Sequence, residues 1–121
     1  HYKSFKKIQN LETFVNLKVL YLEGNAISKI EGLDQLVNLT SLYLHENCIE
    51  KIEGLDNLCN LANLNLSDNL IKKIENLKGL TNLSNLLLKR NRIGIKGIED
   101  LQGLLELGKE IAVIYLSDNL I

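Results

Sequence analysis

The residue types that most often perform chemistry are sparse in this chain. It has two histidines, His1 and His45, and two cysteines, Cys48 and Cys59. His45 has no nearby Ser or Cys nucleophile with a third group to orient it, and no glycine-rich phosphate loop is present. The cysteine spacing fits no zinc pattern, and the histidines do not complete one. We therefore predict no catalytic residue, no cofactor, no metal site and two reduced thiols.

Composition places the chain among ordinary folded proteins. Its 121 residues suggest one domain, and 45% are hydrophobic, with a formal net charge of −1. This near-zero charge argues against nucleic acid as a ligand. We see no signal peptide and no apolar run of about 18 residues that could span a membrane. Because the chain lacks Met and begins at His1, we interpret it as a segment of a longer protein. The two reduced thiols favour a cytoplasmic protein, and we expect a monomer.

Asparagine recurs at an interval of 22 residues through most of the chain. Each asparagine lies in one repeated phrase, written LKVLYLEGNAI, LTSLYLHENCI, LANLNLSDNLI, LSNLLLKRNRI and, last, IAVIYLSDNLI. A fixed period of this length is the signature of a solenoid, in which similar coils stack on one another. The asparagines of the five phrases are Asn25, Asn47, Asn69, Asn91 and Asn119.

Each repeat carries two hydrophobic patterns in succession. The alternation LxL before the asparagine predicts a short strand, and the later spacing IExLxxL predicts a tight turn or one turn of 3-10 helix. Each coil then has a strand on its concave side and turns opposite, with leucines and isoleucines pointing inward. The predicted repeats are 17–38, 39–60, 61–82 and 83–110, with partial repeats at 1–16 and 111–121.

The interval lengthens near the end of the chain. Asn91 and Asn119 are 28 residues apart, six more than the period. The extra residues fall near 94–97 and 104–110, and the stretch 97–109 is predicted to form a helix on the convex side. The sequence therefore predicts an α/β solenoid with about five short parallel strands on the concave face, 3-10 turns and one convex helix.

The repeated asparagine lies where the chain leaves each strand. Backbone groups in a buried turn need hydrogen-bond partners, and an asparagine amide carries donors and an acceptor. We therefore predict that the five asparagines form a structural ladder and bind no ligand, with Lys3 at the equivalent position of the first partial repeat. A similar turn role is predicted for a second column, formed by Asn16, Asn38, Asn60 and Asn82.

Strand residues between the inward leucines face the concave surface by alternation. They vary between repeats while the leucines do not, as in a scaffold that carries a binding face. Tyr21 and Tyr43 lie on adjacent strands, and this pair is either an interface anchor or simple cross-strand packing. The predicted protein-binding residues are Val19, Tyr21, Glu23, Ser41, Tyr43, His45, Asn63, Asn65, Asn85, Leu87, Lys89 and Tyr115.

Two charged features of this face have alternative interpretations. Glu23 beside His45 makes either a structural pair or a pH-sensitive one. Lys89, Arg90 and Arg92 form a basic corner that either meets an acidic segment of a partner or is simply solvated. Sequence alone does not choose between these alternatives.

The phrase NxIxxIExLxxL resembles the leucine-rich repeat, in the 22-residue variant typified by the regulatory subunit of protein phosphatase 1. Longer stretches, HYKSFKKIQNLETFVNLKVLYLEGNAISKIEGL, LYLHENCIEKIEGL and LNLSDNLIKKIENL, closely resemble the leucine-rich-repeat region of dynein axonemal assembly factors. Ser4 replaces the glycine usual in that family, and GIKGIEDLQGLLELGKEIAVIYL is looser than the rest. The resemblance implies a protein without catalysis that helps to preassemble dynein arms in the cytoplasm, for cilia or flagella.

This resemblance also implies the kind of partner. Dynein chains, chaperones or other assembly factors are expected to bind the scaffold. Two other functions stay open: a regulatory subunit that binds a protein phosphatase 1 catalytic subunit, and a structural spacer within a cytoskeletal protein. None of the three involves an enzyme activity, a nucleic acid or a membrane.

Overall fold

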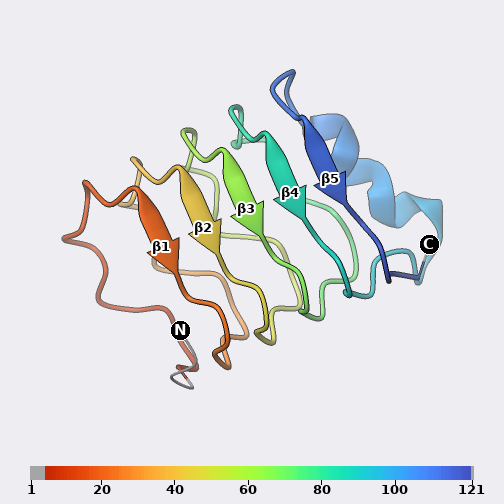
Figure 1. Cartoon of the computed structure of the whole chain (residues 1–121), viewed down its shortest axis with the longest axis horizontal. Helices are drawn as coiled ribbons and strands as arrows, with labels where there is room; N and C mark the ends of the chain where they lie inside the picture. The colour runs from red at the N-terminus through yellow and green to blue at the C-terminus, as the bar shows by residue number, and fades with distance from the viewer. Residues whose placement is uncertain (1–4, 121) are drawn as a thin grey trace.

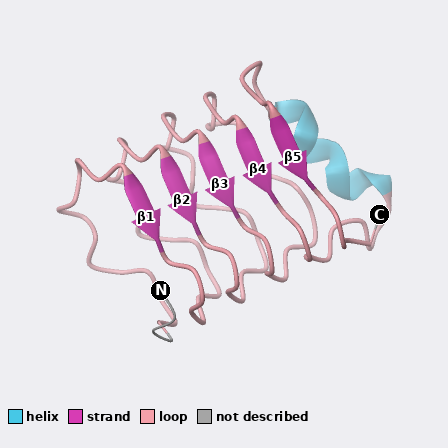
Figure 2. Cartoon of the chain, in the orientation of Figure 1, coloured by secondary structure: helices cyan, strands magenta, loops and turns pink. Residues whose placement is uncertain are grey.

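The chain folds into a stack of coils with one parallel sheet along a single side (Figure 1). The computed structural model describes residues 5–120. Each strand is three residues long, and strands that follow one another in sequence are neighbours in the sheet (Figure 2). The predicted parallel solenoid is confirmed. Its strands are β1 (Val19–Tyr21), β2 (Ser41–Tyr43), β3 (Asn63–Asn65), β4 (Asn85–Leu87) and β5 (Val113–Tyr115).

The register of the sheet follows the sequence period. Leu42 pairs with Leu20 on one side and with Leu64 on the other, each 22 positions away. The same position of the pattern therefore lies beside itself in every coil. Between β4 and β5 the offset grows to 28, as Leu86 pairs with Ile114. The coil between these two strands takes up the six additional residues.

The turns opposite the sheet are tight, as the threefold spacing predicts. In one coil the Leu36 N–H donates to the Leu33 carbonyl (3.0 Å), and the Leu39 N–H donates to the Leu36 carbonyl (3.1 Å). Both bonds join a residue to the third one before it, which is the 3-10 pattern. The same two bonds recur at the equivalent positions of the next two coils.

One continuous core of leucines and isoleucines runs between the sheet and the turns. Side chains of the inner coils, such as Leu42, Ile52 and Leu64, are fully buried, whereas Leu20 and Leu104 near the ends are only partly buried. A fully buried Leu or Ile contributes about 1.5–3 kcal/mol. The inner coils are therefore the best-packed part of the molecule, and β2, β3 and β4 rest on them.

The longer coil contains helix η1 (Ile98–Glu106), a 3-10 helix that lies behind the sheet near β5 (Figure 1). It packs on an earlier coil, where the Ile74 N–H donates to the Asp100 carbonyl (2.8 Å). The helix predicted at 97–109 is thus found, but it is shorter because the backbone at Leu107 is already extended. In the part of the chain that the structure describes, no helix is long and apolar enough to cross a membrane.

Candidate functional site: the concave face

The repeated asparagines form a ladder inside the coils. Asn47, 8% exposed, accepts a hydrogen bond from the Ile27 N–H through Oδ1 (3.0 Å). Its Nδ2 donates to the carbonyls of Leu22 and Leu44, both at 3.0 Å. These bonds join adjacent coils and leave the amide no surface for a ligand. Bonds of the same kind to backbone groups are made by Asn25, Asn69, Asn91 and Asn119.

The second asparagine column bridges coils on the far side. Asn38 Nδ2 donates to the Val15 carbonyl of the preceding coil at 2.9 Å. Asn60 and Asn82 make the equivalent bond, at 3.1 and 2.9 Å. These three bonds are exposed, so they restrain the turn more weakly than the buried ladder does.

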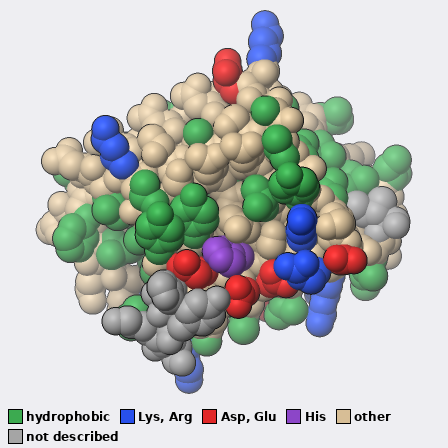
Figure 3. Space-filling model, in the orientation of Figure 1, with side chains coloured by type: hydrophobic (Ala, Val, Ile, Leu, Met, Phe, Trp, Pro, Cys, Tyr) green, Lys and Arg blue, Asp and Glu red, His purple; other side chains and the backbone are tan. Residues whose placement is uncertain are grey.

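The concave face consists of three rows of side chains across the sheet. The first row is Val19, Ser41, Asn63, Asn85 and Val113. The second row is Tyr21, Tyr43, Asn65, Leu87 and Tyr115. The third row, just past the strands, is Glu23, His45, Ser67, Lys89 and Ser117. Figure 3 shows two apolar clusters on this face, separated by a polar area and bordered by charged side chains.

Tyr21 and Tyr43 form a stacked pair at one end of the second row. Their ring centroids are 4.9 Å apart and their planes differ by 5°. The pair therefore packs across the strands, yet Tyr21 stays 58% exposed. Rings that are held in place but open to solvent provide large contact area with little loss of side-chain freedom on binding.

His45 lies between Glu23 and Ser67 in the third row, because these residues are 22 positions apart. The stacking of the coils therefore places a serine in the same row as His45. Within residues 5–120, however, no hydrogen bond joins His45 to Ser67. The buried Ser67 Oγ accepts from the Lys89 N–H (3.1 Å), and the His45 ring meets Tyr43 edge-on, at 6.3 Å and 83°. The contact between a nucleophile and a base that catalysis needs is therefore not formed by His45 and Ser67.

The predicted basic corner is divided by neighbouring side chains. Arg90 forms a two-point ion pair with Asp68, with Nε–Oδ1 at 2.5 Å and Nη2–Oδ2 at 2.9 Å. These bonds lower the pKa of the Asp68 carboxyl from its ordinary 3.8 and raise the pKa of Arg90. Lys89 Nζ lies 4.7 Å from the centre of the Tyr115 ring, a cation–π contact. Two of the three cations are therefore engaged. Sequence reasoning missed Asp68, although an opposite charge one period before Arg90 was the available signal.

A hollow of about 260 Å³ lies in the concave face over β3 and β4. Tyr43 of β2 and Tyr115 of β5 stand at its two ends, and no charged side chain lines it. The sequence could not locate this hollow, because its shape depends on the distance of the Tyr43 and Tyr115 rings from the asparagine amides between them. Its lining residues are Tyr43, Asn63, Leu64, Asn65, Asn85, Leu87, Val113 and Tyr115.

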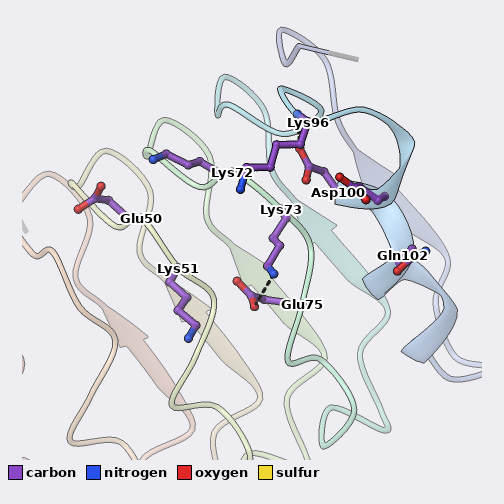
Figure 4. Close-up of a pocket in the computed structure, with 9 residues that line it drawn as sticks. Glu50, Lys51, Lys72, Lys73, Glu75, Lys96, Asp100 and Gln102 are labelled. Carbon is purple, nitrogen blue, oxygen red and sulfur yellow. Dashed lines mark hydrogen bonds and ion pairs between the residues drawn. The ribbon is translucent and has the colours of Figure 1, made fainter.

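A second hollow, of about 580 Å³, lies on the turn side beside η1 (Figure 4). Lys73 and Glu75 form an ion pair there at 3.6 Å. The buried Asp100 carboxylate accepts from the backbone N–H groups of Gly94 (3.2 Å) and Lys96 (3.0 Å), so it holds the turn. Lysines alternate with acidic residues around this hollow, and it favours neither sign of charge. Its lining residues are Glu50, Lys51, Lys72, Lys73, Glu75, Lys96, Glu99, Asp100 and Gln102.

The remaining candidates for chemistry are metal-binding side chains and the two cysteine thiols. Within the described range 5–120, no three His, Cys, Asp or Glu side chains gather in a way that could hold a metal ion. Cys48 and Cys59 are free thiols on the surface. The predictions for Lys3 and Ser4 fall outside the described residues.

Comparison with known proteins agrees with this architecture. Residues 15–57 match the family model of Leucine Rich repeats (2 copies). No curated protein sequence matches the chain. The matched residues cover β1, β2 and their turns, and the remaining coils repeat the same pattern. Residues 15–57 are therefore leucine-rich repeats, and the chain as a whole has the leucine-rich-repeat fold.

Solved structures with this fold include proteins of Listeria monocytogenes. An internalin (InlF) is 28% identical over 96% of the chain, with a TM-score of 0.80. Internalin C2 is 33% identical over 94%, with a TM-score of 0.76. The functional domain of InlJ, 20% identical over 93% with a TM-score of 0.64, shows the fold alone. The chain spans 33%, 48% and 28% of these three proteins, respectively, which is less than half of each.

Proposed function

We propose that this chain is a protein–protein interaction scaffold without catalysis, and that it binds its partner on the concave face. The stacked pair Tyr21–Tyr43 is the observation that carries the proposal. It offers an exposed aromatic surface that joins β1 to β2, and its two rings are held in a stacked arrangement. Binding to such a preorganised surface loses little conformational entropy, and tyrosine is among the residues most enriched in interface hot spots.

Within this role, we propose that the protein takes part in the cytoplasmic preassembly of axonemal dynein arms for cilia or flagella. The support is the sequence resemblance of the segments that contain ENCIEKIEGL and the neighbouring repeats to dynein axonemal assembly factors. The solved structures support the fold and add nothing on the partner. The proposed partners are dynein chains, chaperones or other assembly factors, bound by a monomer.

Affinity purification from ciliated or flagellated cells tests this proposal. The tagged wild-type protein is compared with a Tyr21→Ala, Tyr43→Ala double variant and with a matched control, Asp34→Ala with Gln35→Ala, two exposed residues on a turn away from the sheet. We expect dynein chains and chaperones with the wild type and the control, and their loss with the tyrosine variant. With a purified partner, that loss should reach about 2 kcal/mol or more.

Other outcomes separate the alternatives. Recovery of a protein phosphatase 1 catalytic subunit would favour the regulatory-subunit function. Partners that are lost with the turn-side control variant but retained by the tyrosine variant would overturn the assignment of the concave face. The absence of any specific partner would favour the structural spacer. The melting temperature of each variant must be measured alongside, so that loss of binding is not mistaken for unfolding.

A further inference from the structure

The asparagines in the hollow over β3 and β4 have unused hydrogen-bonding groups. Asn65 Oδ1 accepts from the Ser67 N–H (3.1 Å), and Asn85 Nδ2 donates to Asn63 Oδ1 (2.5 Å). In the described part of the chain, no group accepts a hydrogen bond from Asn65 Nδ2 and none donates to Asn85 Oδ1. The hollow therefore presents a free donor and a free acceptor between two aromatic rings.

We infer that this hollow binds an extended, uncharged segment of a partner protein, an inference that rests on the proposed function. An extended chain carries a free N–H and a free C=O at each residue, and these match the Asn85 acceptor and the Asn65 donor. The two asparagines are diagonal neighbours in the sheet, which places them about 7–8 Å apart. Alternate residues of an extended chain are separated by about 7 Å. The spacing therefore suits two alternate residues of one segment.

The dimensions of the hollow also favour an extended occupant. Tyr43 and Tyr115 are three strand positions apart, or about 14 Å at the usual strand spacing, which is the length of about four extended residues. A helix laid on this surface would have free backbone groups only at its ends. The amides of Asn65 and Asn85 would then lose water without gaining a partner, which is unfavourable.

The charge of the hollow argues for a neutral segment. None of its lining residues is charged, and the cations at its edge are already engaged, Lys89 by Tyr115 and Arg90 by Asp68. A charged side chain entering the hollow would lose its hydration without finding a counterion. The partly buried Leu87 and the tyrosine rings instead provide contacts for one apolar side chain.

Selection from a phage-displayed library of random linear peptides tests the inference. Wild-type protein is the target, and the best peptide is then titrated against Asn65→Asp and Asn16→Asp. Asn65→Asp keeps the oxygen that accepts from Ser67 but removes the free donor and adds a charge. The control adds the same charge at an exposed turn. We expect the selected peptides to contain about four uncharged residues in a row. Their affinity should be at least about tenfold lower for Asn65→Asp than for the wild type, whereas Asn16→Asp should bind them as the wild type does.

A second pair of variants guards against misfolding of Asn65→Asp. Leu87→Ala should weaken the same peptide, whereas Leu105→Ala, at a residue that is 88% exposed on η1, should not. Failure to select a peptide, selection of charged peptides, or equal binding to all variants would overturn the inference. If Asn65→Asp retains the natural partners that the tyrosine variant loses, this inference fails and the proposed function stands. If both variants retain them, the concave-face function fails as well.

Discussion

Replacing Asn47 with leucine tests whether the ladder holds the coils together. The Asn47 side chain forms hydrogen bonds with four backbone groups. It accepts from the Ile27 N–H and donates to the carbonyls of Leu22, Leu44 and, at 3.3 Å, His45. Leucine has similar size but no polar atom. The substitution therefore removes all four bonds while leaving the volume of the turn nearly unchanged.

The four losses are not equal, because three of the groups have a second partner. The Leu22 carbonyl also accepts from Asn25 Nδ2 and the Leu44 carbonyl from Asn69 Nδ2, both at 3.0 Å. The His45 carbonyl still accepts from a backbone N–H (3.1 Å). Only the Ile27 N–H would be buried without a partner, a penalty of about 1–3 kcal/mol. With the weaker losses at the carbonyls, we expect a total of about 2–4 kcal/mol.

Thermal and urea unfolding measure this difference. For a chain of this length, a change of 1 kcal/mol shifts the melting temperature by about 3–6 °C, so Asn47→Leu should melt roughly 6–24 °C below wild type. Amide exchange at Ile27 should accelerate selectively. The control is Asn38→Ala, which removes a single exposed bond and should lower the stability by about 1 kcal/mol or less. A melting temperature within about 2 °C of wild type, or an equal loss in the control, would refute the ladder argument.

Three further predictions concern the helix, the ion pair and the thiols. Gly103→Ala should destabilise the fold by about 1–3 kcal/mol or more in urea unfolding, because the added Cβ would lie 2.0 Å from a backbone carbonyl of an earlier coil; a silent substitution would show that η1 does not pack there. Asp68→Asn should lower the melting temperature at pH 7 by less than Asn47→Leu does. Because folding lowers the Asp68 pKa, the pair with Arg90 stabilises the fold above pH 3.8, and the difference should vanish as the pH falls through the lowered pKa. Cys48 and Cys59 should both react with a maleimide in the native protein, since both are exposed and free; mass spectrometry that found a disulfide between them would contradict this.

Much of the fold could be predicted from the repeat alone. Stacked coils bury the same positions in every unit, so one 22-residue pattern determines the strands, the inward leucines and the direction of the sheet. The tight turns followed from the threefold spacing of Leu33, Leu36 and Leu39, because three residues make one turn of 3-10 helix and so bring such residues to one side. The six additional residues before Asn119 located the helix, although its length depended on where packing ended it.

Residue type does not predict the backbone conformation beside the asparagine ladder. The residue before each ladder asparagine has a positive φ, from 53° to 69°. Glycine adopts this conformation freely, but Glu46 and Arg90 do so at an energetic penalty of about 1–2 kcal/mol. Nothing in these side chains predicts the conformation. The asparagine amides and the bonds to neighbouring coils impose it, so only the stacked structure decides it.

The sequence by itself determined that this is a leucine-rich-repeat solenoid, and it identified the residues that form the concave face. Tertiary structure decided which of those residues act together: Arg90 with Asp68, Lys89 with Tyr115, and Asn65 Oδ1 with the Ser67 N–H, which leaves Asn65 Nδ2 without a partner among the described residues. A repeat places side chains in the same row because its period is that of the coil. Hydrogen bonds, ion pairs and hollows depend in addition on side-chain rotamers and on differences of less than an ångström between coils, which a period does not encode.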